Sequence, residues 1–133
     1  MSSNGSQEGF NVQYIRIGSG IGPGYPIYTV ISSRNEFGQF SQYSANGSFW
    51  ATGFRNAVLK YTDEFFENNF LVIIVLEESS GSNRHEVVSV DINGDIVVKR
   101  LVPEIGTSDM ATWNIIIELD NSFKREQFQV IFQ

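Results

Sequence analysis

The spacing of apolar residues changes along the chain and marks out its strands. Residues 70–77 (FLVIIVLE) form a nearly continuous apolar run that is rich in β-branched residues and too short for a typical helix. Such a run predicts a central strand buried on both faces. β-branched and aromatic segments predict further strands, at residues 12–17, 25–31, 86–91, 95–102, 112–119 and 127–132.

Helical signals lie between the second and third predicted strands. Ser33 and Glu36 have the spacing of a capping box, which predicts the start of a short helix. Apolar residues recur at i, i+3, i+4 and i+7 over residues 54–61 and predict a second helix. A threonine followed by two acidic residues predicts one further turn at residues 63–67.

This order of elements predicts an α+β fold rather than a plain β-sandwich. We expect a β-rich, mainly antiparallel sheet of about seven strands, with two or three short helices between the second and third strands. The first two strands are expected to pair, and the four C-terminal strands to form a meander. Residues 1–10 are predicted to be a flexible leader, and residues 11–133 a single β-rich domain.

The composition excludes several classes of functional site. The 133 residues include no Cys and one His, with 9 Lys and Arg against 15 Asp and Glu, a net charge of −6. The lack of Cys excludes disulfides, thiolate metal sites and cysteine nucleophiles, and we predict no metal and no cofactor. An acidic chain with scattered basic residues predicts no nucleic-acid partner. No apolar run approaches the length of a membrane span, so none is predicted.

The first nine residues are polar or small after the initiator, without the basic and apolar regions of a signal peptide. Two interpretations of localisation stay open. The protein is cytoplasmic, or it is extracellular or attached to the cell envelope and its export signal is not part of this sequence.

Residues 91–95 (DINGD) begin like a calcium-binding EF-hand loop. The pattern then fails, because Ile96 stands where glycine is required and Val102 where a bidentate glutamate is required. An Asn-Gly pair between two strands instead predicts a tight hairpin at Asn93 and Gly94.

The densest group of polar side chains follows the central strand. Glu78, Arg84, His85 and Glu86 flank several serines there, and we take these four as candidates for partner binding. An ordinary salt-bridged loop is the structural alternative. A catalytic alternative has Ser80 or Ser82 activated by His85 with a glutamate orienting it, but no nucleophile elbow or oxyanion loop accompanies these residues.

The two tryptophans receive different predictions. Trp113 begins an apolar strand and is expected in the core, whereas Trp50 has polar neighbours and is a further candidate for partner binding. Among the candidates, Arg84 is the strongest, because its planar guanidinium suits bidentate recognition of a carboxylate.

Two long segments carry a resemblance to a known family. They are LVIIVLEESSGSNRHEV at residues 71–87 and VPEIGTSDMATWNIIIEL at residues 102–119. The C-terminal half resembles the C-terminal domain of the protease-complex subunit PrcB. It is even more similar to a group of small clostridial-type proteins, often exported and lipid-anchored, which YIRIGSGIGPGYPIYTVISS and KYTDEFFENNF upstream also resemble. A His often follows the Trp in that group, where this chain has Asn114.

The resemblance implies a bacterial β-rich protein that binds or stabilises a partner at the cell envelope, with no enzymatic activity. We therefore predict a non-enzymatic protein-interaction or stabilising module with an unidentified protein partner. The alternative is a small-ligand or carbohydrate-binding protein, or a minor hydrolase, that uses the loop at residues 79–86. A third hypothesis is a structural protein that forms a homodimer through the strand at residues 127–132.

Overall fold

The computed structural model of the chain describes residues 10–17, 27–45 and 59–133. These residues form seven strands, two α-helices and one 3-10 turn. In chain order the elements are β1 (Phe10–Ile17), β2 (Ile27–Ile31), α1 (Arg34–Ala45), α3 (Phe65–Asn68), β3 (Asn69–Glu78), β4 (Arg84–Val90), β5 (Asp95–Leu101), β6 (Ala111–Asp120), η1 (Asn121–Phe123) and β7 (Gln129–Phe132). The first strand thus begins at Phe10, which the sequence analysis placed in the leader.

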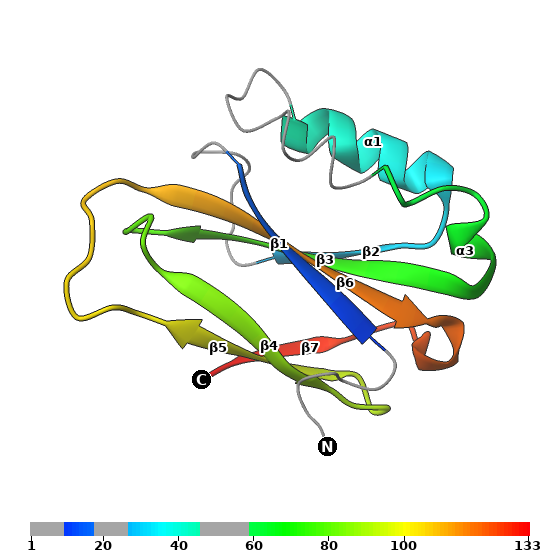
Figure 1. The fold of residues 1–133 in the computed structure, drawn as a ribbon. Helices are drawn as coiled ribbons and strands as arrows, with labels where there is room; N and C mark the ends of the chain where they lie inside the picture. Colours follow the sequence, from blue (N-terminus) through cyan, green and yellow to red (C-terminus); the bar gives the residue numbers. More distant parts are fainter. Residues whose placement is uncertain (1–9, 18–26, 46–58) are drawn as a thin grey trace.

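The strands divide into two sheets (Figure 1). One has four antiparallel strands in the order β1-β6-β3-β2, and the other has three strands in the order β4-β5-β7, with β7 parallel to β5. The predictions of one seven-stranded sheet, of pairing between the first two strands and of a C-terminal meander are therefore wrong. The fold is β-rich and broadly α+β.

The central position of β3 explains its apolar sequence. It pairs with β2 on one side and β6 on the other, and every residue from Phe70 to Leu76 is buried. The prediction of a central strand buried on both faces is confirmed. Because side chains alternate along a strand, β3 supplies one set of apolar residues to each face of its sheet.

The larger core lies between the two sheets. It contains alternate residues of β3 and β6 on one side and inward residues of β4 and β5 on the other, with Trp113 near one end. Two tyrosines join the sheets at their edges. The Tyr14 hydroxyl accepts a hydrogen bond from the Val87 amide at 2.8 Å, and the Tyr28 hydroxyl accepts one from the Phe128 amide at 3.0 Å.

The smaller core lies on the outer face of the four-stranded sheet, which α1 covers (Figure 1). The predicted capping box is present at the start of this helix. The Glu36 amide donates to the Ser33 hydroxyl at 3.0 Å, and the Glu36 carboxylate accepts from the Ser32 amide at 2.6 Å. Phe37 follows directly and is fully buried in this core.

The predicted further turn at residues 63–67 corresponds to α3, which spans Phe65–Asn68, and the Thr62 hydroxyl accepts from the Phe65 amide at 3.2 Å. Most of the predicted helix at residues 54–61 lies outside the described residues. Tyr61, its last residue, is not helical, and its side chain is buried in the smaller core.

The hairpin between β4 and β5 has the predicted turn. Gly94 has a φ of 94°, a conformation that glycine adopts without strain. One Asp91 carboxylate oxygen accepts from the amides of Asn93 at 2.9 Å and Asp95 at 3.1 Å, so it stabilises the turn. Since β4 and β5 run in opposite directions, this hairpin and the β5–β6 loop lie at opposite ends of their sheet (Figure 1).

Candidate functional site

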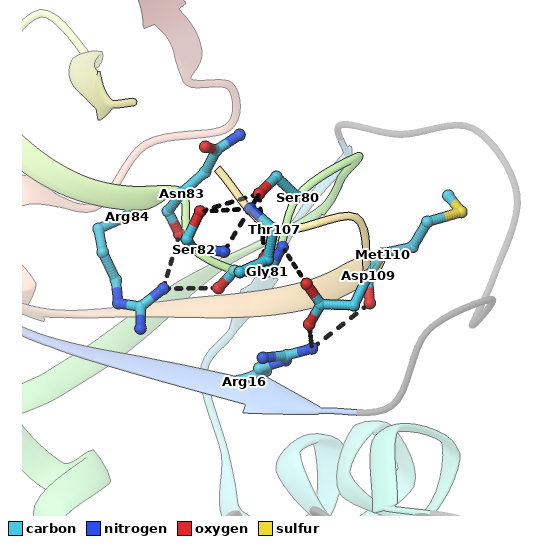
Figure 2. Close-up of polar contacts among 9 residues, drawn as sticks. All are labelled: Arg16, Ser80, Gly81, Ser82, Asn83, Arg84, Thr107, Asp109 and Met110. Atoms are coloured by element: carbon cyan, nitrogen blue, oxygen red, sulfur yellow. Dashed lines mark hydrogen bonds and ion pairs between the residues drawn. The ribbon is translucent and has the colours of Figure 1, made fainter. Parts of the chain in front are cut away.

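Two loops meet at the end of the sandwich away from the hairpin (Figure 1), and Figure 2 shows the contacts between them. One is the β3–β4 loop, residues 79–83, and the other is the β5–β6 loop, residues 102–110. The Thr107 amide donates to the Ser80 hydroxyl at 2.9 Å and to the Ser82 hydroxyl at 3.3 Å. Ser80 also shares a hydroxyl hydrogen bond with Ser82 at 2.9 Å. These bonds hold the middle of the longer loop against the shorter one.

A second contact holds the end of the β5–β6 loop. The Asp109 carboxylate accepts from the Arg16 guanidinium at 2.8 Å and from the Gly81 amide at 3.3 Å (Figure 2). Hydrogen bonds from Thr107 and Arg16 hold the pKa of Asp109 well below its usual range. A β-carbon at Gly81 would overlap the ends of the Asp109 and Arg16 side chains, so a larger residue there would displace them.

Apolar side chains are exposed around the loop that these contacts hold. The exposed fractions are 40% for Leu101, 57% for Val102, 86% for Ile105 and 53% for Met110. Exposed apolar residues that occur singly are normal, but these four lie within ten consecutive residues, which makes them a candidate contact surface. We call these four residues the apolar loop surface.

Arg84 lies next to this surface. It is the first residue of β4 and pairs with Leu101 of β5, and its side chain is exposed. Its Nη1 donates to the Gly81 carbonyl at 2.7 Å and to the Asn83 carbonyl at 3.1 Å (Figure 2). Its guanidinium carbon lies 5.2 Å from the centre of the Trp113 ring, within the range of a cation–π contact.

An ionic cluster around the buried Glu78 lies below the loops, between the two sheets, and its Arg100 side chain reaches the surface. Glu78, at the end of β3, faces inward and is almost completely buried. Arg100 of β5 donates to both of its carboxylate oxygens, from Nε at 3.0 Å and from Nη2 at 2.6 Å. His85 Nε2 lies 2.7 Å from one oxygen, and Asn83 Nδ2 donates to the other at 2.9 Å.

These contacts determine the ionisation of Glu78. Burial opposes the charged form, but the bonds from Arg100, Asn83 and His85 outweigh it and hold the pKa of Glu78 at about 2. Glu78 is therefore ionised at neutral pH and can only accept hydrogen bonds, so His85 Nε2 carries the proton between them. The cluster connects one sheet to the other, because its acid belongs to β3 and its donors to β4, β5 and the β3–β4 loop.

The geometry does not assemble the catalytic arrangement that the sequence allows. His85 Nε2 is occupied by Glu78, and the buried Nδ1 has no hydrogen-bond partner among the described residues. Ser80 and Ser82 instead bond each other and Thr107. Neither serine hydroxyl is thus in contact with the imidazole.

The structure brings together three of the five predicted site residues. Glu78 and His85 are bonded inside the sandwich, and Arg84 lies at its rim because side chains alternate along β4. Glu86 is also exposed and lies opposite Lys99 of β5. Trp50 lies outside the described residues, and Trp113 is in the core as predicted.

Two parts of the site were missed. Arg100 was not predicted because its contact with Glu78 depends on how the sheets pack, but a basic residue in an apolar strand is a signal that could have indicated it. The β5–β6 loop was not among the predicted binding residues, although Ile105 and Met110 lie in it among polar residues.

Within the described part of the chain, no group of three or more His, Asp or Glu residues is arranged to hold a metal ion. Among the helices of the same residues, none is both long and apolar enough to span a membrane.

Comparisons of the chain with protein-family models, with curated proteins and with solved structures found no match. The resemblance to the PrcB C-terminal domain and to the clostridial-type group therefore stays a prediction.

Proposed function

We propose that this protein is a non-enzymatic interaction module that binds a polypeptide partner through the apolar loop surface. The observation that carries the proposal is the combination of exposed apolar side chains with a loop held in place by polar contacts. Ile105, the most exposed of the four, lies two residues from Thr107, whose amide is bonded to both serines of the facing loop.

Apolar burial and a low entropy cost both favour binding through the apolar loop surface. Leaving aliphatic side chains in water forgoes about 25 cal/mol for each Å² that a partner could cover. A loop that is already ordered loses little conformational entropy when it binds, so more of this free energy appears as affinity. The Ser80–Thr107 and Arg16–Asp109 contacts provide that order.

The contacts of the other polar residues favour a binding role over a hydrolytic one. His85 and Arg100 both bond Glu78 and connect the sheets, so the Glu78 carboxylate and His85 Nε2 are engaged within the protein. Arg84 and the aliphatic side chains are exposed at this end, together with polar residues of the β5–β6 loop such as Glu104. The resemblance to PrcB-like and clostridial-type proteins supports the same role and a location at the cell envelope.

Selection of peptides from a random displayed library tests the proposal. The wild-type protein and the variants Ile105→Ser and Ile92→Ser would be compared as immobilised targets. Ile92 is a matched control, because it is also an exposed isoleucine, at 62%, but lies in the hairpin at the opposite end of the sheet. We expect selected peptides to share aliphatic residues and to lose binding to Ile105→Ser only. Peptides that bind both variants as well as wild type, or an unenriched library, would contradict the proposal.

A further inference from the structure

The guanidinium of Arg84 is already positioned before any partner binds. Two backbone carbonyls, of Gly81 and Asn83, hold its Nη1, and the Trp113 ring lies against it. A free arginine side chain loses much rotational freedom when it binds a ligand. Since these contacts have already fixed the Arg84 side chain, less of that freedom remains to be lost.

The other edge of the same guanidinium has no partner. Among the described residues, no acceptor contacts Nε or Nη2 of Arg84, and the side chain is exposed. Arg100 shows what such an edge binds, because its Nε and Nη2 together hold the two oxygens of the Glu78 carboxylate. The edge of Arg84 that corresponds to the carboxylate-binding edge of Arg100 is therefore without an acceptor among the described residues.

Nearby cations already have acidic neighbours. Arg16 is paired with Asp109, Arg100 with Glu78, and Lys99 lies opposite Glu86 on the paired strands. Arg84 has none among the described residues. It also adjoins Leu101, the first residue of the apolar loop surface, since the two pair across β4 and β5.

We infer that the partner presents a carboxylate to Arg84 beside aliphatic side chains that cover the apolar loop surface. The inference rests on the proposed function and names the chemistry of its ligand. The carboxylate can belong to an aspartate or glutamate side chain or to a chain terminus, because both present the same pair of oxygens.

A titration followed by NMR tests the inference with three synthetic peptides. The first is end-capped and has a central aspartate flanked by leucine and valine. The second has asparagine in place of the aspartate, and the third has the same aliphatic residues with a free C-terminal carboxylate as its only acid. Each is titrated into the wild-type protein and into Arg84→Lys, which keeps the positive charge but lacks the planar pair of donors.

We expect resonances of Arg84 Nε–H and of the Leu101 and Val102 amides to shift with an acidic peptide. Such a peptide should bind at least about tenfold more tightly than the asparagine peptide, and Arg84→Lys should reduce that difference, because lysine lacks the paired donors. Which acidic peptide binds identifies the source of the carboxylate. The comparison of peptides on the wild-type protein stands even if Arg84→Lys disturbs the loop.

Two results would overturn the inference, and they differ in what they say of the proposed function. Equal affinity for the aspartate and asparagine peptides would remove the role of the carboxylate and leave the apolar loop surface as the binding site. The absence of any shift at Arg84, Leu101 and Val102 with all three peptides would count against both.

Discussion

Replacing Glu78 with glutamine should destabilise the sandwich, and the lowered pKa of Glu78 indicates the order of magnitude of the loss. Glutamine has the shape of the protonated acid, so Glu78→Gln removes the charge that Arg100 and His85 contact and retains the volume. Holding the pKa of Glu78 at about 2, against 4.5 for an ordinary glutamate, corresponds to about 3 kcal/mol of folding free energy. Glu78 is buried but the Arg100 side chain is 43% exposed, so the cost should not exceed the roughly 3–5 kcal/mol of breaking a fully buried ion pair.

The same reasoning gives the pH dependence of the effect. Because the pKa of Glu78 is lower in the folded protein, its ionised form stabilises the fold fully above about pH 4.5. This contribution is lost as the pH falls from 4.5 towards 2, where the wild-type carboxyl also becomes neutral. The difference in stability between wild type and Glu78→Gln should therefore be about 3 kcal/mol at neutral pH and should close over that interval.

Urea unfolding followed by tryptophan fluorescence, over a series of pH values, measures this difference. Trp113 is a suitable probe because its ring contacts both His85 and Arg84. Glu126→Gln is the control, since Glu126 is exposed and the same change of charge there should leave stability within about 0.5 kcal/mol of wild type. A cost below about 1 kcal/mol at neutral pH, or a difference that persists at pH 2, would refute the reasoning.

Three further predictions concern other parts of the fold. Asn114 is fully buried, and neither of its amide atoms has a partner among the described residues. Asn114→Leu should therefore raise the free energy of unfolding by about 1 kcal/mol. An unchanged or lower value in urea unfolding would contradict this prediction. Tyr61 donates to the buried Glu118 at 2.7 Å, and Tyr61→Phe should cost about 1–3 kcal/mol in the same assay. Burial and this bond raise the pKa of Tyr61 far above 10, so spectrophotometric titration should show its phenol ionising only on unfolding. Gly81→Ala should displace the Asp109 side chain and speed amide hydrogen exchange in the β5–β6 loop. Exchange rates equal to those of the wild type would show that the order of the loop does not depend on the contact between Gly81 and Asp109.

Elements with a local signal were predictable from the sequence. The buried strand β3 shows as an apolar run, the start of α1 as a capping box, and the turn at Gly94 as an Asn-Gly pair. Each depends on residues that are close together in the chain. Local chemistry is therefore enough to identify these elements.

The arrangement of strands was not predictable in the same way. β3 pairs with β6, more than thirty residues later, and β7 crosses back to lie parallel to β5. Alternation along a strand shows that one face is buried but not which strand lies beside it. The prediction of adjacent pairing used the commonest connection, and this chain departs from it.

In the candidate site as well, the grouping of residues close in the chain was predictable and the contacts between distant residues were not. The sequence placed Arg84, His85 and Glu78 in one polar group because they are neighbours in the chain. The sequence did not show that His85 is buried and Arg84 exposed, since this depends on which side chains of β4 point into the core. Arg100 and Ile105 join the site only through the pairing of β4 with β5 and the bonds between the two loops.

Photo-crosslinking in the native cell is the most direct test of binding through the apolar loop surface. A photoreactive amino acid would replace Ile105 in one variant and Ile92 in another, and both would be expressed at the wild-type level. The account predicts a discrete protein adduct from position 105 that position 92 does not form and that Arg84→Lys weakens. No adduct at position 105, or the same adducts from both positions, would contradict it.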